Sequence, residues 1–175
     1  MRIFALELDN DIKGIKRRKA YIEGLIKKLP KPYIVVLSEL AKCSYMASQK
    51  IWKLADDCGR DASQWTVSIA KKYNNYIGAG YLDKENGGYY NRYMIAGPDG
   101  VCGVVTKSEG ESAVFKRGDF GSIIHTPFGN VGVGMPYHIL CIRYQDAQRG
   151  KKQYRNNLRK PFILGRLFLC KYLEI

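Results

Sequence analysis

Two residues of opposite charge stand at the ends of predicted β-strands. Glu39 closely follows the apolar run 33–37, and Lys107 directly follows the β-prone run 101–106. In an open α/β sheet, functional sites form outside the carboxyl ends of the strands. A carboxylate there can serve as a general base, because partial burial raises its pKa towards neutrality. An ammonium there can stabilise the oxyanion of a tetrahedral intermediate. Taken singly, each residue is more often a solvent-exposed strand end or part of a surface ion pair.

The N-terminal part of the chain predicts a strand, a helix and a second strand. Residues 2–8 are apolar-rich and end at Asp9-Asn10-Asp11, which is typical of a strand before a turn. A helix is expected from about Asp11 to Pro30, with most basic residues, Arg18 among them, away from its apolar face. That face contains Ile12, Ile15, Ile22, Ile26 and Leu29. The run 33–37 is continuously apolar, as in a strand covered on both faces.

A second helix and a group of antiparallel strands are expected next. Asp61 can cap a helix whose apolar stripe is Ala62, Trp65, Ile69 and Tyr73. The runs 76–81, 89–96 and 101–106 are separated by tight turns at 85–88 and 97–100, which predicts an antiparallel meander. A last strand is expected over 130–135. Strands and helices that alternate, with hairpins inserted, indicate an α/β sandwich in one domain.

In order and spacing, three stretches resemble the motifs of the carbon–nitrogen hydrolase (nitrilase/amidase) superfamily. They are Ser38-Glu39-Leu40 with Cys43-Ser44-Tyr45 after it, Lys107 with Glu111 and Phe115–Asp119, and Gly132–Tyr137. Tyr90-Asn91 matches a Tyr-Asn dipeptide that the family has on the preceding strand. The resemblance covers residues 1–135 and implies an α/β fold. That fold would be the first half of the family's α-β-β-α sandwich, in incomplete form.

The resemblance also implies a role for each matched residue. Glu39 would be the general base that activates a thiol, and Lys107 would hold the oxyanion. Glu111 would be a supporting acid that orients Lys107 or the substrate. The substrates implied are small amides or nitriles, and no cofactor or metal is expected. The family's sandwich commonly pairs through its sheets, so a homo-oligomer is consistent with the resemblance.

The position of the family's nucleophilic cysteine is occupied by Pro136 in this chain. A proline side chain offers no nucleophile, so it cannot form the thioester intermediate of the family's reaction. Tyr137 and His138 also replace the family's aromatic-acid pair. Cys141 lies five residues further on, about 16 Å along an extended chain, and cannot substitute in place. We therefore expect negligible amidase or nitrilase turnover from this chain.

Residues 136–175 form a basic tail that does not match the family. They hold 9 Lys and Arg against 2 Asp and Glu, which is more than half of the net charge of +13. Within 138–175 we expect none of the strands that the family places next. Met135-Pro136 is encoded by ATGCCN, in which the letters TGC, one base later, encode Cys. A frameshift is therefore one explanation for the tail, and a diverged or misassembled gene is the alternative explanation.

An incomplete sandwich exposes apolar strand faces and unpaired edges. We therefore interpret the chain as a truncated member of the family, and we expect it to be poorly soluble or loosely folded by itself. The tail interleaves basic residues with Tyr154 and Phe162, a content that can bind single-stranded nucleic acid. A solvated helix or an out-of-frame segment is the favoured explanation, so nucleic acid is not an expected partner.

Composition excludes several other classes. The five cysteines are odd in number and scattered, with no Cys-x-x-Cys pair, and there are only two histidines, His125 and His138, which argues against a disulfide framework or a zinc site. No apolar run is long enough to cross a bilayer, and acidic residues come too early for a signal peptide, so a cytoplasmic location without a membrane partner is expected. A binding protein of the same fold, without hydrolysis, remains the main alternative function.

Overall fold

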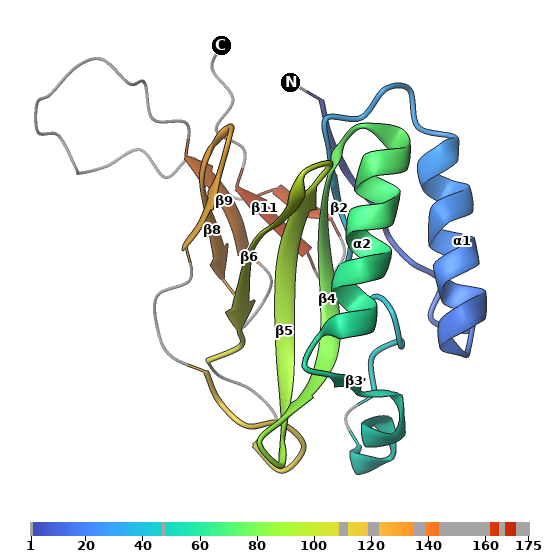
Figure 1. Ribbon diagram of the computed structural model, residues 1–175, viewed down its shortest axis with the longest axis vertical. Coiled ribbons are helices and arrows are strands. Elements are labelled where there is room, and N and C mark those ends of the chain that lie inside the picture. Colours follow the sequence, from blue (N-terminus) through green and yellow to red (C-terminus); the bar gives the residue numbers. More distant parts are fainter. Residues whose placement is uncertain are drawn as a thin grey trace, which may run out of the picture.

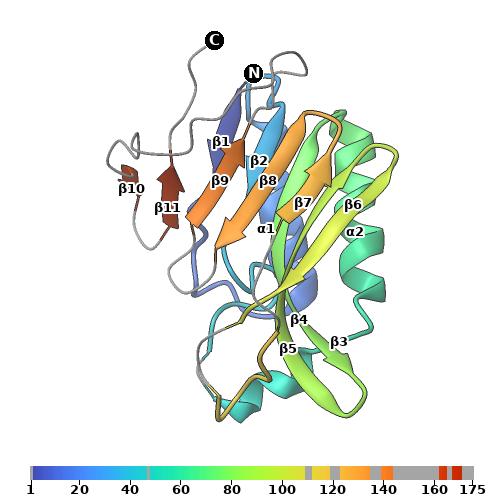
Figure 2. The ribbon, with the colours of Figure 1, turned by 90° about the vertical axis from the view of Figure 1, so that its left-hand side faces the viewer.

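The structure, a computed structural model, describes residues 2–46, 48–108, 112–118, 123–134, 139–143, 162–164 and 167–170. In this part of the chain, two β-sheets are stacked and a layer of helices covers the outer face of one of them (Figures 1 and 2). The helix layer contains α1 (Ile15–Lys27) and α2 (Arg60–Tyr73). A 3-10 helix, η1 (Gln49–Leu54), lies between them in sequence.

The first sheet begins with parallel strands and ends with antiparallel ones. Its order is β1 (Ile3–Ala5), β2 (Ile34–Val36), β4 (Tyr76–Glu85), β5 (Gly88–Gly97) and β6 (Gly100–Thr106). The short strand β3 (Asp56–Asp57) pairs with the far end of β4. β1, β2 and β4 run parallel, whereas β4, β5 and β6 form the predicted antiparallel meander.

The second sheet consists of strands from the C-terminal part of the chain. Its order is β10 (Phe162–Leu164), β11 (Leu167–Cys170), β9 (Ile139–Arg143), β8 (Gly129–Gly134) and β7 (Ile123–Thr126). β8 pairs antiparallel with both β7 and β9, and Gly132 lies opposite Cys141. The expectation of no strands within 138–175 was therefore wrong. The run Ile139–Ile142 is apolar and β-prone, and it extends the sheet beyond the predicted boundary at 135.

Each face of β2 packs against a different layer. Val35 contacts the helix layer, in a buried cluster that also contains Ile22, Ile26, Leu37, Ala41, Ile69, Ala70, Ile77 and Ala79. Ile34 and Val36 point to the second sheet, in a cluster with Tyr93, Ile95, Val105, Ile124, Phe128, Val131 and Val133. This arrangement confirms the prediction of a strand covered on both faces, and it makes β2 the centre of the core.

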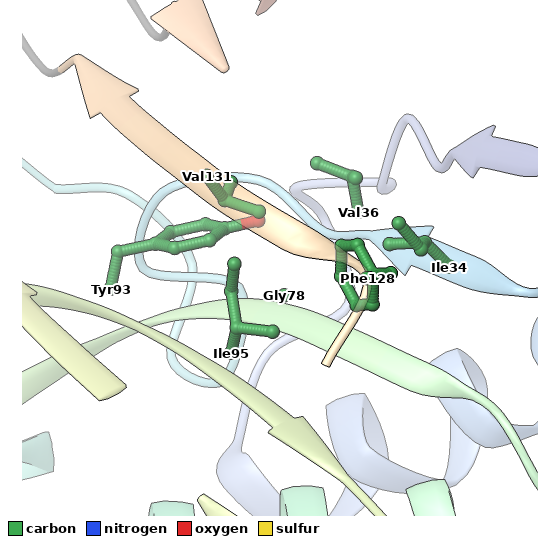
Figure 3. Close-up of a pocket in the computed structure, with 7 residues that line it drawn as sticks. All are labelled: Ile34, Val36, Gly78, Tyr93, Ile95, Phe128 and Val131. Carbon is green, nitrogen blue, oxygen red and sulfur yellow. The ribbon is translucent and has the colours of Figure 1, made fainter. Parts of the chain in front are cut away.

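A small apolar cavity of about 10 Å3 remains between the two sheets (Figure 3). Its lining is Ile34, Val36, Gly78, Tyr93, Ile95, Phe128 and Val131. A volume of this size is at the lower limit for one water molecule, and the lining is apolar. The cavity is therefore a packing gap and has no room for a substrate.

The structure differs from the sequence-based predictions at two residues, Asp61 and Arg18, and in three short elements. α2 is preceded by Gly59 as its N-cap, and Asp61 lies within its first turn. The short elements η1, β3 and β7 had no clear periodicity and were not predicted. Arg18 is buried on the inner side of α1, where its guanidinium donates to the carbonyl oxygens of Ala41 (2.7 Å) and Asp9 (2.8 Å). A polar side chain can occupy a core position when carbonyls satisfy it, which a hydrophobic pattern does not reveal.

Neither helix in the described part of the chain combines the length and apolarity needed to cross a bilayer. Cys43, Cys58 and Cys102 are free thiols.

Candidate active site

Glu39 and Lys107 meet in a buried ion pair. The Lys107 Nζ atom lies 2.6 Å from Glu39 Oε1, and the two side chains are only 7% and 8% exposed. The Asn91 Nδ2 atom donates a hydrogen bond to the same oxygen. The predicted strand ends thus converge, and β5 adds a third polar group. Charge-assisted hydrogen bonds of this kind fix the orientation of a carboxylate more firmly than neutral ones.

The backbone of β5 and β6 sets the position of Lys107. Arg92 lies opposite Thr106, so Lys107 comes directly after the last paired residue of β6. Its N–H donates to the carbonyl oxygen of Asn91 at 2.8 Å. The N–H of Gly118 in turn donates to the carbonyl oxygen of Lys107 at 2.8 Å. Lys107 is therefore held at the end of the sheet by bonds on both sides of its peptide.

Glu39 sits on a turn that approaches β4 very closely. The N–H of Gly80 donates to the Ser38 carbonyl oxygen at 3.3 Å. A Cβ atom on Gly80 would lie 2.8 Å from Glu39 Cα and 2.6 Å from the Leu40 nitrogen, closer than atoms can pack. Leu40 also adopts a left-handed φ of 49°, which is uncommon for a non-glycine residue. Gly80 is thus required for the turn that presents Glu39.

Buried cations hold the continuation of this turn. Lys42 Nζ contacts Asp56 Oδ2 at 2.7 Å and Asp61 Oδ2 at 2.8 Å, and the Lys42 and Asp56 side chains are 3% and 4% exposed. Asp56 also accepts hydrogen bonds from the N–H groups of Asp61 (3.1 Å) and Ala62 (2.5 Å), so it caps α2 from outside the helix. Arg18 contacts the Ala41 carbonyl from the other side. The turn after β2 is therefore attached to both α1 and α2.

A short segment, residues 112–118, packs across the end of the meander. The indole N–H of Trp52 donates to the Val114 carbonyl oxygen at 2.8 Å, and the Trp52 ring stacks on Tyr89 with centroids 4.5 Å apart. The N–H of Lys116 donates to the Tyr89 carbonyl oxygen at 2.7 Å. This segment connects η1, β5 and, through Gly118, the backbone of Lys107.

The thiol closest in sequence to Glu39 is not a substitute nucleophile. Cys43 is buried, and burial raises the pKa of its thiol to about 11. Only the thiolate is an effective nucleophile, so this side chain is inert at neutral pH. Among the described residues, no group of three or more His, Cys, Asp or Glu side chains is arranged to hold a metal ion.

The structure brings together two of the residues singled out from sequence. Glu39 and Lys107 are in contact. Glu111 and Pro136 lie outside the described residues, so their predicted roles stay predictions. The contact from Asn91 and the close approach of Gly80 were not predicted. The Tyr-Asn match gave a signal for Asn91, whereas a single glycine in a β-strand gave only a general indication of close backbone approach.

The chain is similar to known proteins over part of its length. The chain is 30% identical to omega-amidase NIT2 from Bos taurus, over 73% of this chain and 52% of that protein. It superposes on the crystal structure of a carbon–nitrogen hydrolase from Helicobacter pylori with a TM-score of 0.66 and 25% identity, over 74% of this chain and 49% of that one. Over that part of its length, the chain belongs to the carbon–nitrogen hydrolase superfamily.

A third comparison supports the same fold. A carbon–nitrogen hydrolase superfamily protein from Xanthomonas campestris, with an arsenic adduct in its active site, has a TM-score of 0.66 at 17% identity. The alignment covers 79% of this chain and 51% of that one. No protein-family model matches the chain. The chain spans about half the length of these relatives.

Proposed function

We propose that this chain carries the general-base and oxyanion-binding part of a carbon–nitrogen hydrolase site, and that it does not hydrolyse amides or nitriles by itself. The observation that carries the proposal is the buried contact of 2.6 Å between Lys107 Nζ and Glu39 Oε1. A carboxylate and an ammonium at strand ends are the groups needed on either side of a reacting carbonyl. Small amides are the substrate class that the name of the bovine relative suggests.

The chemistry would require a nucleophile that the sequence does not provide. In thiol-dependent amide hydrolysis, a cysteine thiol gives its proton to a base and its sulfur bonds to the carbonyl carbon. Glu39 would accept that proton, and Lys107 would stabilise the negative charge that develops on the carbonyl oxygen. Pro136 at the matched position can supply neither the sulfur nor the proton. The remaining groups can polarise a bound amide, but they form no covalent intermediate.

Ammonia release from a panel of small primary amides and nitriles tests the proposal. The unmodified chain should release no ammonia above the buffer rate, and Glu39→Gln should behave in the same way. In Pro136→Cys, the new thiol should react with iodoacetamide faster than the same thiol in a Pro136→Cys/Glu39→Gln variant. The comparison of these two variants reports activation by Glu39. Turnover by the unmodified chain that disappears in Glu39→Gln would show that the nucleophile is supplied by another residue.

A second function, amide binding without hydrolysis, is favoured by one further observation. Asn91 is fully buried, and its Oδ1 atom accepts no hydrogen bond from the described residues. An unsatisfied buried acceptor is costly, and an amide N–H group would satisfy it if the side chains that cover Asn91 moved apart to admit the ligand. Chemical-shift changes of the Asn91 side-chain amide on titration with a primary amide would support binding at this site. Saturable binding that is unchanged in Lys107→Met would place the ligand elsewhere.

A further inference from the structure

The outer face of α1 is basic at both ends. Lys16, Arg17 and Lys27 lie on α1, Lys28 is its C-cap, and Lys13 and Lys31 flank the helix; all six residues are exposed. Figure 1 shows α1 at the margin of the molecule, on the side of the helix layer. Glu23 is the acidic residue within α1, and its carboxylate bonds to Lys72 at 2.7 Å. Within the described residues, Lys13 contacts the Asn10 carbonyl and the side chains of the other five cations form no ion pair or hydrogen bond, although the charge of Lys27 helps to lower the pKa of Glu23.

The N-terminal end of this face is unfavourable for its own helix, whereas Lys27 in the last turn is favourable. Lys16 and Arg17 lie in the first turn, where the helix dipole favours acidic residues and where α1 has none. The N-cap residue Gly14 provides no side-chain hydrogen bond. The packing of Ile22 and Ile26 holds α1 in place, and unfavourable local choices at an exposed helix start are expected where a surface serves another purpose.

The middle of the face is made of small residues. Ala20 and Gly24 are exposed and lie between the two basic clusters. A Cβ atom on Gly24 would meet nothing within 4 Å, so neither packing nor backbone conformation requires a glycine there. Glycine inside a helix is destabilising relative to alanine. Its presence is explained if an external surface must approach the helix backbone closely.

We propose that the outer face of α1 binds the phosphates of a nucleic-acid duplex without reading its sequence. A basic domain with Lys and Arg along one helix is the electrostatic pattern of such binding. The two clusters are about 16 Å apart along the axis at 1.5 Å per residue. That separation is comparable with the width of the major groove of B-DNA, about 12 Å, so each cluster faces one phosphate strand. Ala20 and Gly24 let the helix lie close to the groove and offer no groups that distinguish bases.

The arrangement fits a duplex better than a membrane. Helices that bind in a membrane interface bury large apolar side chains among the lipids. The middle of this face has only Ala20 and Gly24, so nothing can insert.

Fluorescence anisotropy with a labelled DNA duplex of two helical turns tests the proposal on the full chain. The unmodified protein should bind in the micromolar range at low salt, and its affinity should fall steeply between about 50 and 200 mM salt. A variant with Lys16, Arg17, Lys27 and Lys28 changed to Gln should bind at least about tenfold more weakly at low salt. The slope of log K against log salt should become shallower by about 3 to 4, since each lost phosphate contact removes about 0.9.

A matched control removes the same charge elsewhere. Lys50, Lys53, Lys84 and Arg117 are exposed and lie outside α1, and their replacement by Gln should change the affinity by less than about threefold. Gly24→Gln adds a long side chain where the duplex should approach the helix closely, so it should weaken binding several-fold. It keeps the net charge and improves helix propensity, so it should not lower the melting temperature. These two variants separate binding by α1 from net charge and from stability.

Four results would overturn the proposal. The first is that the unmodified chain does not bind the duplex at low salt. The second is that the α1 variant and its matched control lose equal affinity. The third is that affinity falls only when Arg149, Lys151, Lys152 and Arg155 of the tail are changed to Gln. The fourth is binding to vesicles with a quarter of phosphatidylserine but not to the duplex, which would assign the face to a membrane surface.

Discussion

Removal of the Asp56 carboxylate should destabilise the fold strongly, because Asp56 has two structural functions. It is the buried partner of Lys42, and it caps α2 through the N–H groups of Asp61 and Ala62. Removing one partner of a buried ion pair costs about 3–5 kcal/mol. Asp61 remains as a second, half-exposed partner of Lys42, so the lower end of this range applies. Loss of the cap adds about 1 kcal/mol, which gives a total near 4 kcal/mol for Asp56→Ala.

Urea unfolding followed by circular dichroism measures this difference. Asp57→Ala is the matched control, since Asp57 pairs with Arg60 on the surface and should cost less than about 1 kcal/mol. The double variant Lys42→Met/Asp56→Leu should recover much of the loss, because apolar residues can replace a buried ion pair at little cost. A loss below about 1 kcal/mol for Asp56→Ala would refute the reasoning, since Lys42 would then tolerate burial without its partner.

Four further outcomes are expected. Gly80→Ala should destabilise by about 1–3 kcal/mol, because its Cβ would overlap the backbone at Glu39 and Leu40. Gly24→Ala, the same change at an open helical position, should stabilise by about 1 kcal/mol, and urea unfolding measures both. At pH 8, mass spectrometry after thiol alkylation should find Cys58 modified and Cys43 unmodified, because burial raises the pKa of Cys43 to about 11. Because the pKa of Cys43 is raised in the folded state, its neutral thiol contributes to the free energy of unfolding below about pH 9. This contribution is lost as the pH rises towards 11. The free energy of unfolding of Cys43→Ala should therefore decrease less than that of the unmodified chain over this pH range.

The sequence predicted the elements whose patterns are local. The continuous apolar run at 33–37 gave β2, and the turns at 85–88 and 97–100 gave the meander of β4, β5 and β6. Because both candidate residues follow strands of one sheet, their approach could be expected before any distance was known. The confirmed contact between Glu39 and Lys107 follows from that topology.

Interactions between distant segments could not be predicted in the same way. The N-terminus of α2 is capped by Asp56 and, through the Gly59 N–H, by Asp83 from β4, whereas local rules favoured Asp61. Arg18 was assigned to the polar face because hydrophobic periodicity counts a cation as exposed. In both cases the deciding partners are carbonyls or carboxylates brought in by the tertiary fold, and these have no fixed spacing in sequence.

The energetics of the Glu39–Lys107 pair indicate that stability alone does not explain it. Desolvation of two charges largely offsets their attraction, and well-packed apolar residues in place of a buried ion pair are often neutral or stabilising by about 1–4 kcal/mol. Glu39 is presented by a turn with a left-handed residue and a required glycine. These features position a carboxylate against an ammonium, which is the arrangement that polarising a carbonyl requires.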